Sequence, residues 1–126
     1  RMPALNASLG ISQLRKLSDK INKRRMLAQV YQSVVAEIDV LGFQSEPDNS
    51  NSNYWLSTIF LQPDVCNPSL ACIELLDQIS KIGYQPRKLW LPLPLNPPYA
   101  QFPRSNISTS LDIHSRYLSL PSIPIR

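Results

Sequence analysis

The chain has 126 residues and a formal net charge of +4 at pH 7, with 43% hydrophobic and 17% charged residues. A chain of this size can bury one modest core, so we expect one domain or a part of one. The hydrophobic content excludes wholesale disorder. The sequence contains no run of about 18 apolar residues, which a membrane-spanning helix would need. No secretory signal is visible, and because the first residue is Arg1 we expect that an N-terminal stretch is missing.

Cysteine and histidine are too few for a metal centre. Cys66 and Cys72 are the only cysteines, and the lone His114 lies far from them in the sequence. This is poor material for a zinc site, so we expect no metal. We interpret the two thiols as reduced structural residues and His114 as a surface residue. Reduced thiols favour a cytoplasmic location.

The N-terminal region has the apolar spacing of a long amphipathic helix. Pro3 fits the first helical position, and from Leu14 onwards apolar residues recur every three or four positions up to Gly42, the expected helix end. Gly10 indicates either close packing or a break between two helices. Arg24 falls on the apolar stripe, so its side chain must snorkel or meet a partner.

Basic residues gather in the same helix. Residues 15–25 carry six lysines and arginines, opposed within that stretch only by Asp19. Such a cluster could face phosphate groups. A solvated helix face is the simpler interpretation, and we prefer it.

The middle of the chain alternates between loop, strand and helix signals. The polar cluster 46–53 predicts an exposed loop, and residues 54–61, rich in aromatic and β-branched side chains, predict a buried strand. Asn67 and Pro68 open a second helix that ends at Gly83. The residues predicted for one side of this helix are Leu70, Ile73, Leu76, Ile79 and Ile82.

Residues 83–99 are a proline-rich segment that excludes a long helix or a central strand, because each proline removes a backbone donor. Within it, residues 84–90 predict a strand at a sheet edge. The segment could serve as a ligand for a partner's aromatic groove. Its leucines and Trp90 would be too apolar to leave in water, so we favour a buried loop.

The C-terminal region predicts a short helix and a strand. Ser108 and Thr109 are candidate N-caps of a helix through Ser115, with Asp112 at capping-box spacing from Thr109. Residues 117–120 predict a last strand. The whole order of helix, strand, helix, strand, loop, helix and strand is that of an α/β or α+β layer.

Chemistry-bearing motifs are absent. A chain with three glycines cannot form a Gly-rich phosphate loop. Asp112, His114 and Ser115 lie together on the predicted helix, where neighbouring positions point to different sides, so they do not make a catalytic triad. The residues alone therefore indicate no catalytic centre within this stretch.

Several short stretches nevertheless form an ordered set. They are RMPALNASLG at 1–10, NYWL at 53–56, GYQPRKLWLPLPLNPPY at 83–99, PR at 103–104 and LPS at 120–122. The set resembles the DegT/DnrJ type of pyridoxal-phosphate-dependent nucleotide-sugar aminotransferases. The NYWL stretch is similar to that of the branch that makes legionaminic-acid and bacillosamine-like amino sugars.

The resemblance implies an α/β fragment from the C-terminal part of a homodimeric fold-type-I enzyme. Residues 1–42 would be the end of the large domain and a long connecting helix, and residues 43–126 a small C-terminal α/β domain truncated at both ends. The enzyme would move an amino group from a donor such as glutamate to a keto-sugar nucleotide, in amino-sugar and surface-polysaccharide biosynthesis. Its cofactor, pyridoxal 5′-phosphate, would be bound mainly by an upstream part that carries the Schiff-base lysine. This stretch would then hold no catalytic residue and be inactive alone.

The resemblance also implies binding residues. Arg1 would reach across the dimer towards the neighbour's cofactor phosphate, a task that suits a permanently charged bidentate donor. Arg87, Trp90 and Tyr99 would belong to a wall near the sugar nucleotide. An edge strand packed by an indole is the competing interpretation of Arg87 and Trp90.

Two positions depart from the family pattern, and two other readings stay open. Pro94 stands where the family usually has histidine and Lys88 where it has proline. The chain could instead be a non-catalytic module that grips an acidic partner or nucleic acid through 15–25 and the proline-rich segment, or a decayed fragment. For the enzyme we expect no nucleic-acid and no membrane partner, and for the isolated stretch a marginal or aggregating monomer.

Overall fold

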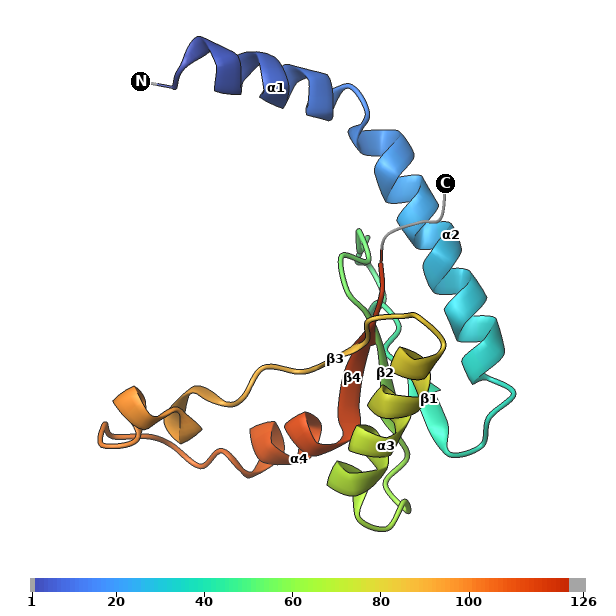
Figure 1. The fold of residues 1–126 in the computed structure, drawn as a ribbon, viewed down its shortest axis with the longest axis vertical. Coiled ribbons are helices and arrows are strands. Elements are labelled where there is room, and N and C mark those ends of the chain that lie inside the picture. The colour runs from blue at the N-terminus through green and yellow to red at the C-terminus, as the bar shows by residue number, and fades with distance from the viewer. Residues whose placement is uncertain (1, 123–126) are drawn as a thin grey trace.

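The computed structural model describes residues 2–122. Two helices precede the sheet, and a third helix, a proline-rich arm and a fourth helix lie between its strands (Figure 1). In chain order the elements are α1 (Ala4–Leu14), α2 (Leu17–Val35), β1 (Leu41–Phe43), β2 (Ser57–Leu61), α3 (Pro68–Lys81), β3 (Arg87–Lys88), the 3-10 turns η1 (Leu93–Leu95) and η2 (Pro97–Tyr99), α4 (Ser108–Arg116) and β4 (Tyr117–Leu120).

The four strands form one antiparallel sheet in the order β1-β2-β4-β3. In β2, Ser57, Ile59 and Leu61 are buried and alternate with half-buried residues, as the two-residue period of a strand requires. Ile59 pairs directly with Leu118 of β4, so the two side chains share one face of the sheet. This central pair of strands carries the core.

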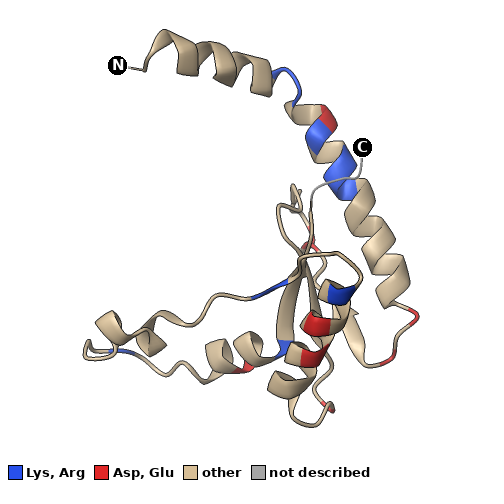
Figure 2. Ribbon diagram, in the orientation of Figure 1, with Lys and Arg blue, Asp and Glu red and all other residues tan. Residues whose placement is uncertain are grey.

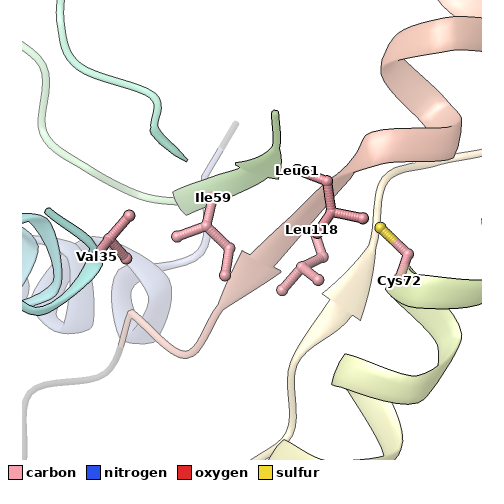
Figure 3. Close-up of a cluster of buried hydrophobic side chains, with 5 residues drawn as sticks. All are labelled: Val35, Ile59, Leu61, Cys72 and Leu118. Atoms are coloured by element: carbon pink, nitrogen blue, oxygen red, sulfur yellow. The ribbon is translucent and has the colours of Figure 1, made fainter. Parts of the chain in front are cut away.

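One buried cluster joins the sheet to two helices (Figure 3). Val35 from the end of α2 and Cys72 from α3 pack with Ile59, Leu61 and Leu118. Because these residues form a single cluster, α2 and α3 cover the same face of the sheet. The mixed α/β architecture agrees with the predicted fold class.

Two parts of the chain project from this core (Figure 1). Helix α1 has no buried residue. Residues 89–107, which we call the proline arm, extend away from the sheet before α4 returns the chain to β4. Within residues 2–122, no helix is long and apolar enough to cross a membrane.

The predicted long helix is two helices that end earlier than expected. The break lies at Arg15 and Lys16, not at Gly10, where an added Cβ would meet no atom within 4 Å. Helix α2 stops at Val35, because residues 36–40 turn back to bring Leu41 into register with Leu61. Gly42 is therefore a strand residue and not a cap.

Gly42 is required by its neighbour across the sheet. The ring of Phe60 lies over it, and a Cβ at this position would clash with that ring. The Phe60 ring also stacks on Tyr117 of β4, with centroids 5.0 Å apart. Strand β1 itself was not predicted, since its three residues are too few to show a pattern.

The predicted strand 54–61 is correct only from Ser57 onwards. Tyr54 has a left-handed backbone with φ of 44°, which ends any continuous extended run, and Trp55 is 61% exposed. The loop predicted at 46–53 is confirmed, with two exceptions to its exposure, because Glu46 and Ser52 are half-buried. The reason for the burial of Glu46 is an ion pair described below.

Helix α3 is confirmed between Asn67 and Gly83, whose φ of +91° suits only glycine. Its predicted inner face is wrong in part. Leu70 and Ile73 are 49% and 55% exposed, whereas Cys72 is fully buried. The helix meets the sheet through Cys72 with its half-buried neighbours Ala71 and Leu75.

The proline arm is not a buried loop. Trp90 and Leu93 are 77% and 60% exposed, because the arm leaves the sheet after β3 and meets little of the described chain. The edge strand predicted within 84–90 is confirmed but spans only Arg87 and Lys88.

Helix α4 and strand β4 are confirmed, but the predicted capping is wrong. The N-cap residue is Ile107 and makes no side-chain cap; the Oδ1 atom of Asn106 accepts from the backbone N–H of Ser108 at 2.8 Å. Asp112 accepts from the Nε of Arg116 at 2.7 Å and so forms an i,i+4 ion pair. Asp112 is therefore engaged by Arg116 and does not form the predicted capping box.

Candidate functional site

An open pocket of about 430 Å³ lies where α2, the segment before β2, strand β3 and the end of β4 approach one another. It is wider than a single water site and within the range of small-ligand pockets. Its lining residues are Arg24, Trp55, Leu56, Gln85, Arg87, Lys88, Leu89, Trp90, Ser119, Leu120, Pro121 and Ser122.

The charge of this pocket is of one sign. Arg24 of α2 and Arg87 and Lys88 of β3 line it, and none of its lining residues is acidic. Basic residues also gather on the first half of α2 (Figure 2). Clefts lined by one sign of charge concentrate ligands of the opposite sign, so this pocket suits an anion.

Two indoles border the same pocket. Trp55 is 61% exposed and Trp90 is 77% exposed, although both side chains are large and apolar. Exposed tryptophans next to cationic groups provide flat surfaces on which planar ligand groups can stack. The pocket thus combines charge and flat apolar contact.

Arg25, next to the pocket residue Arg24, tethers the loop that leads to Trp55. Its Nη2 and Nη1 atoms donate to the two carboxylate oxygens of Glu46 at 2.6 and 3.2 Å. Nη1 also donates to the Oδ1 of Asn51 at 2.6 Å and to the carbonyl oxygen of Ser52. The guanidinium carbon lies 5.6 Å from the centre of the Tyr54 ring.

The ion pair between Arg25 and Glu46 shifts the pKa of both groups. Hydrogen bonding from Arg25, and then from the backbone N–H of Ser52, lowers the pKa of Glu46 below its ordinary value. Hydrogen bonding to Glu46 raises the pKa of Arg25. Both groups are therefore held in their charged forms.

The end of β4 is tied to α2 and to the segment before β2. The hydroxyl of Tyr31 in α2 donates to the carbonyl oxygen of Pro121 at 2.9 Å. Burial, and then the neighbouring Tyr84, raises the pKa of Tyr31, so the hydroxyl keeps its proton. The hydroxyl of Ser122 donates to the carbonyl oxygen of Trp55. These bonds fix one rim of the pocket.

The structure brings together two of the four predicted binding residues. Arg87 and Trp90 line the same pocket. Tyr99 lies in η2 on the proline arm and is not among the lining residues. Arg1 lies outside the described residues. That these residues bind cofactor or substrate stays a prediction.

Sequence reasoning missed several lining residues. The sequence pattern predicts Trp55 in a buried strand and marks Lys88 only as a departure from the family pattern. For Arg24 a signal existed, since a charge on an apolar stripe needs a partner, and the side chain is half-buried at the pocket. The sequence therefore indicated that Arg24 needs a partner, but not where in the fold that partner lies.

A second hollow of about 280 Å³ lies between the proline arm and α4. His114 lines it and is half-buried, so its interpretation as a surface residue is wrong. Its Nδ1 atom is buried and finds no hydrogen-bond partner among residues 2–122. In the same range, no group of three or more potential ligand side chains could hold a metal ion.

Comparison with known structures defines the class of fold. The chain superposes on Helicobacter pylori PseC, an aminotransferase involved in the biosynthesis of pseudoaminic acid, with a TM-score of 0.81 at 21% identity over 96% of this chain and 32% of PseC. The S. venezuelae protein DesV, in complex with a ketimine intermediate, superposes with a TM-score of 0.81 at 21% identity over 98% of this chain and 32% of DesV. The fold is thus a mixed α/β fragment that matches a portion of fold-type-I sugar aminotransferases.

The sequence defines the family. Residues 1–125 match the DegT/DnrJ/EryC1/StrS aminotransferase family, and the chain belongs to it. It is 28% identical over 126 residues to the "Putative pyridoxal phosphate-dependent aminotransferase EpsN" of Bacillus subtilis (strain 168), covering 97% of this chain and 31% of EpsN. The chain therefore spans about a third of the length of the relatives that it matches. The family is one of pyridoxal-phosphate-dependent aminotransferases.

Proposed function

We propose that the chain is part of an enzyme that transfers an amino group from a donor such as glutamate to a keto-sugar nucleotide. The observation that carries the proposal is the cationic pocket between Arg24, Arg87 and Lys88, in a chain of an aminotransferase family. The pathway would be amino-sugar biosynthesis for a surface polysaccharide. The legionaminic-acid and bacillosamine-like branch is the one that the NYWL stretch favours.

The chemistry of a nucleotide diphosphate suits this pocket. A guanidinium group presents donors in a planar fork that matches phosphate oxygens, and the ammonium of Lys88 adds a compact charge. The absence of a lining carboxylate removes a repulsive contact with the ligand. A base or a sugar ring could lie on the indoles of Trp55 and Trp90.

The cofactor is assigned to the family and not to this stretch. When bound, pyridoxal phosphate supplies the electron sink that such amino transfers need. Its pyridine nitrogen pairs with an acidic group, and no acidic residue lines the pocket. The lining of this pocket thus does not fit the pyridine end of the cofactor, and we derive no step through the cofactor. Arg1, as a contact to the cofactor phosphate across a homodimer, remains our proposal from the resemblance alone.

The test uses the natural polypeptide that carries this sequence. We expect its intact mass to be about three times that of the 126-residue chain, because the chain covers 31% of EpsN. We also expect bound pyridoxal phosphate, whose visible absorbance changes when glutamate is added. The 126-residue chain alone should show neither change. Activity of the isolated chain, or a natural polypeptide of its size, would contradict the proposal.

Variants of the pocket give the finer test. In the natural polypeptide, Arg87→Ala should raise the KM for a uridine diphosphate keto-sugar by about tenfold or more, the loss expected for one charge-assisted contact, and Trp90→Ala should raise it because a stacking surface is lost. Lys81→Ala, on the exposed face of α3 and ion-paired to Asp77, is the matched control and should leave KM unchanged. Equal effects of Lys81→Ala and Arg87→Ala would contradict a role of this pocket in binding.

The alternative of a nucleic-acid or acidic-partner module has less support. Of the basic residues at 15–25, Arg25 is engaged by Glu46 and Lys23 is paired to Asp19 at 3.2 Å. Each engaged side chain weakens a phosphate-facing surface. Binding to duplex DNA that falls steeply with added salt would favour this alternative over the enzyme.

A further inference from the structure

The segment that carries Trp55 to the pocket has an unfavourable backbone. Tyr54 holds φ at 44° and Asn49 at 59°. The left-handed region is tolerated by asparagine but is costly for an aromatic residue. Surrounding contacts must therefore hold Tyr54 in place.

Arg25 supplies contacts to both ends of this segment. It binds Glu46 where the loop begins and Asn51 and Ser52 where it ends. Glu46 closes the arrangement, since its Oε2 accepts from the backbone N–H of Ser52 at 2.6 Å. One half-buried guanidinium on α2 thus binds both the beginning and the end of the loop.

Tyr54, the residue with the unfavourable backbone, packs against the Arg25–Glu46 pair. The Tyr54 ring faces the Arg25 guanidinium on one side and lies 6.2 Å from the Phe43 ring, measured between ring centres. The Ser52 hydroxyl accepts from the backbone N–H of Tyr54 at 3.0 Å. The residue before Trp55 is therefore fixed through Ser52 and through Arg25 itself.

The residues next to Arg25 and Tyr54 in the chain line the pocket. Trp55 and Leu56 follow Tyr54 and line the pocket, and Arg24, the residue before Arg25, lines it from α2. The carbonyl oxygen of Trp55 is held from the other side by Ser122. Trp55 therefore sits between two fixed points, one of which is the Arg25 cluster.

We propose that Arg25 is a positioning residue that fixes loop 46–54 and through it the orientation of Trp55 at the pocket. It is not itself among the lining residues of the pocket. The proposal rests on the proposed function only for what the pocket binds. Lysine cannot replace Arg25, because one ammonium on a flexible stem cannot reach Glu46, Asn51 and Ser52 together.

The test measures order in the loop and mobility of one indole. The variants Arg25→Lys, Arg25→Gln and Glu46→Gln are made in the natural polypeptide, and Lys23→Gln, which breaks the exposed pair with Asp19, is the matched control. Hydrogen exchange is read at the backbone amides of Ser52 and Tyr54. Time-resolved fluorescence anisotropy of Trp55 is read in a background in which Trp90, the other tryptophan of these 126 residues, and every tryptophan elsewhere in the natural polypeptide are replaced by phenylalanine.

We expect exchange at the Ser52 and Tyr54 amides to speed up by about tenfold or more in the three loop variants, and the fast motion of Trp55 to grow in amplitude. The amides of Ile59 and Leu118 in the core should stay protected, which separates positioning from general destabilisation. Lys23→Gln should match the unmodified protein in both readouts. If Arg25→Gln does not fold, Arg25→Lys and Glu46→Gln decide the question alone.

Three results would overturn the proposal. They are unchanged loop exchange in Arg25→Lys and Glu46→Gln, loss of core protection in parallel with the loop, or a loosened loop with unchanged motion of Trp55. Titration of the unmodified protein with uridine diphosphate tests the proposed function separately. A protein that binds no uridine diphosphate but loses loop order in Arg25→Lys retains the positioning role and lacks the proposed substrate.

Discussion

The sheet core and the two projections of the chain have similar apolar side chains and opposite environments. Leu118 in β4 is 1% exposed, whereas Leu9 in α1 and Leu93 in the proline arm are each 60% exposed. The difference is not hydrophobicity but the presence of a facing layer. In the core, β2, β4, α2 and α3 each supply a side of the cluster (Figure 3), while nothing in residues 2–122 covers α1.

The comparison bears on how the chain behaves in solution. Exposed apolar side chains that gather on one element, as Leu5, Leu9 and Leu14 do on α1, indicate an interface or a liability to aggregate. The relatives are about three times as long as this chain, which leaves ample surface in them for such contacts. The marginal, aggregating monomer expected for the isolated stretch stays a prediction.

The largest expected effect comes from truncating the core and not the arm. Leu118→Ala should lower the free energy of unfolding by about 2 to 5 kcal/mol, since it leaves a cavity among packed side chains. Leu93→Ala, at a 60% exposed site, should change it by about 0.5 kcal/mol or less. Urea unfolding of both variants measures the difference. Equal losses would mean that the arm is packed in solution.

Glycine substitutions sharpen the same contrast. Gly42→Ala should destabilise by about 1 to 3 kcal/mol, because the added methyl group meets the ring of Phe60. Gly10→Ala meets open space on α1 and should leave stability equal or raise it by up to about 1 kcal/mol. Thermal unfolding compares the two. A stable Gly42→Ala variant would show that Phe60 moves away at little cost.

The two thiols report on the core without a mutation in it. Cys66 is exposed, and Cys72 is fully buried with its pKa raised by burial. Because the thiolate is the reactive form, a disulfide reagent should modify Cys66 within the mixing phase and Cys72 only as the protein opens. Mass spectrometry of the modified peptides measures both rates. Similar rates at Cys66 and Cys72 would contradict a packed α3.

The smallest expected effect concerns the pH dependence of the loop anchor. The pKa of Glu46 is lowered in the folded chain, so between the folded and unfolded values the unfolded chain binds more protons. The stability that the pair contributes is therefore present above the ordinary glutamate pKa of about 4.3 and is lost as pH falls through the lower folded value. Glu46→Gln should remove this part of the acid dependence. An unchanged acid limb would show that the pair is screened by solvent.

Sequence reasoning found the elements that carry their own signals. Proline at the start of α3, Gly83 at its end and the β-branched run of β2 are local features; the two ends of α3 were predicted where they occur, and β2 was predicted three residues too long at its start. The local sequence does not predict strand β1, because its three residues are a strand only through their pairing with β2. The end of α2 at Val35 depends on the same pairing.

The site was less predictable than the fold. Arg87 and Trp90 were named from a resemblance, while Arg24 and Trp55 reach the same pocket from distant positions in the chain. The role of Glu46 in a polar loop could not be read locally, since it depends on Arg25 in another element. Convergence of this kind is a property of the tertiary structure.

Helix α1 has a consequence for the order in which the protein assembles. It has 11 residues, no buried side chain and no acidic residue in its first turn. Helices shorter than about 12 to 15 residues are marginal in water when nothing packs against them. The sheet, α2 and α3 can form around their common cluster first, and α1 would then become helical as it docks. Its circular dichroism signal would therefore serve as a gauge of docking, rising only when a covering surface arrives.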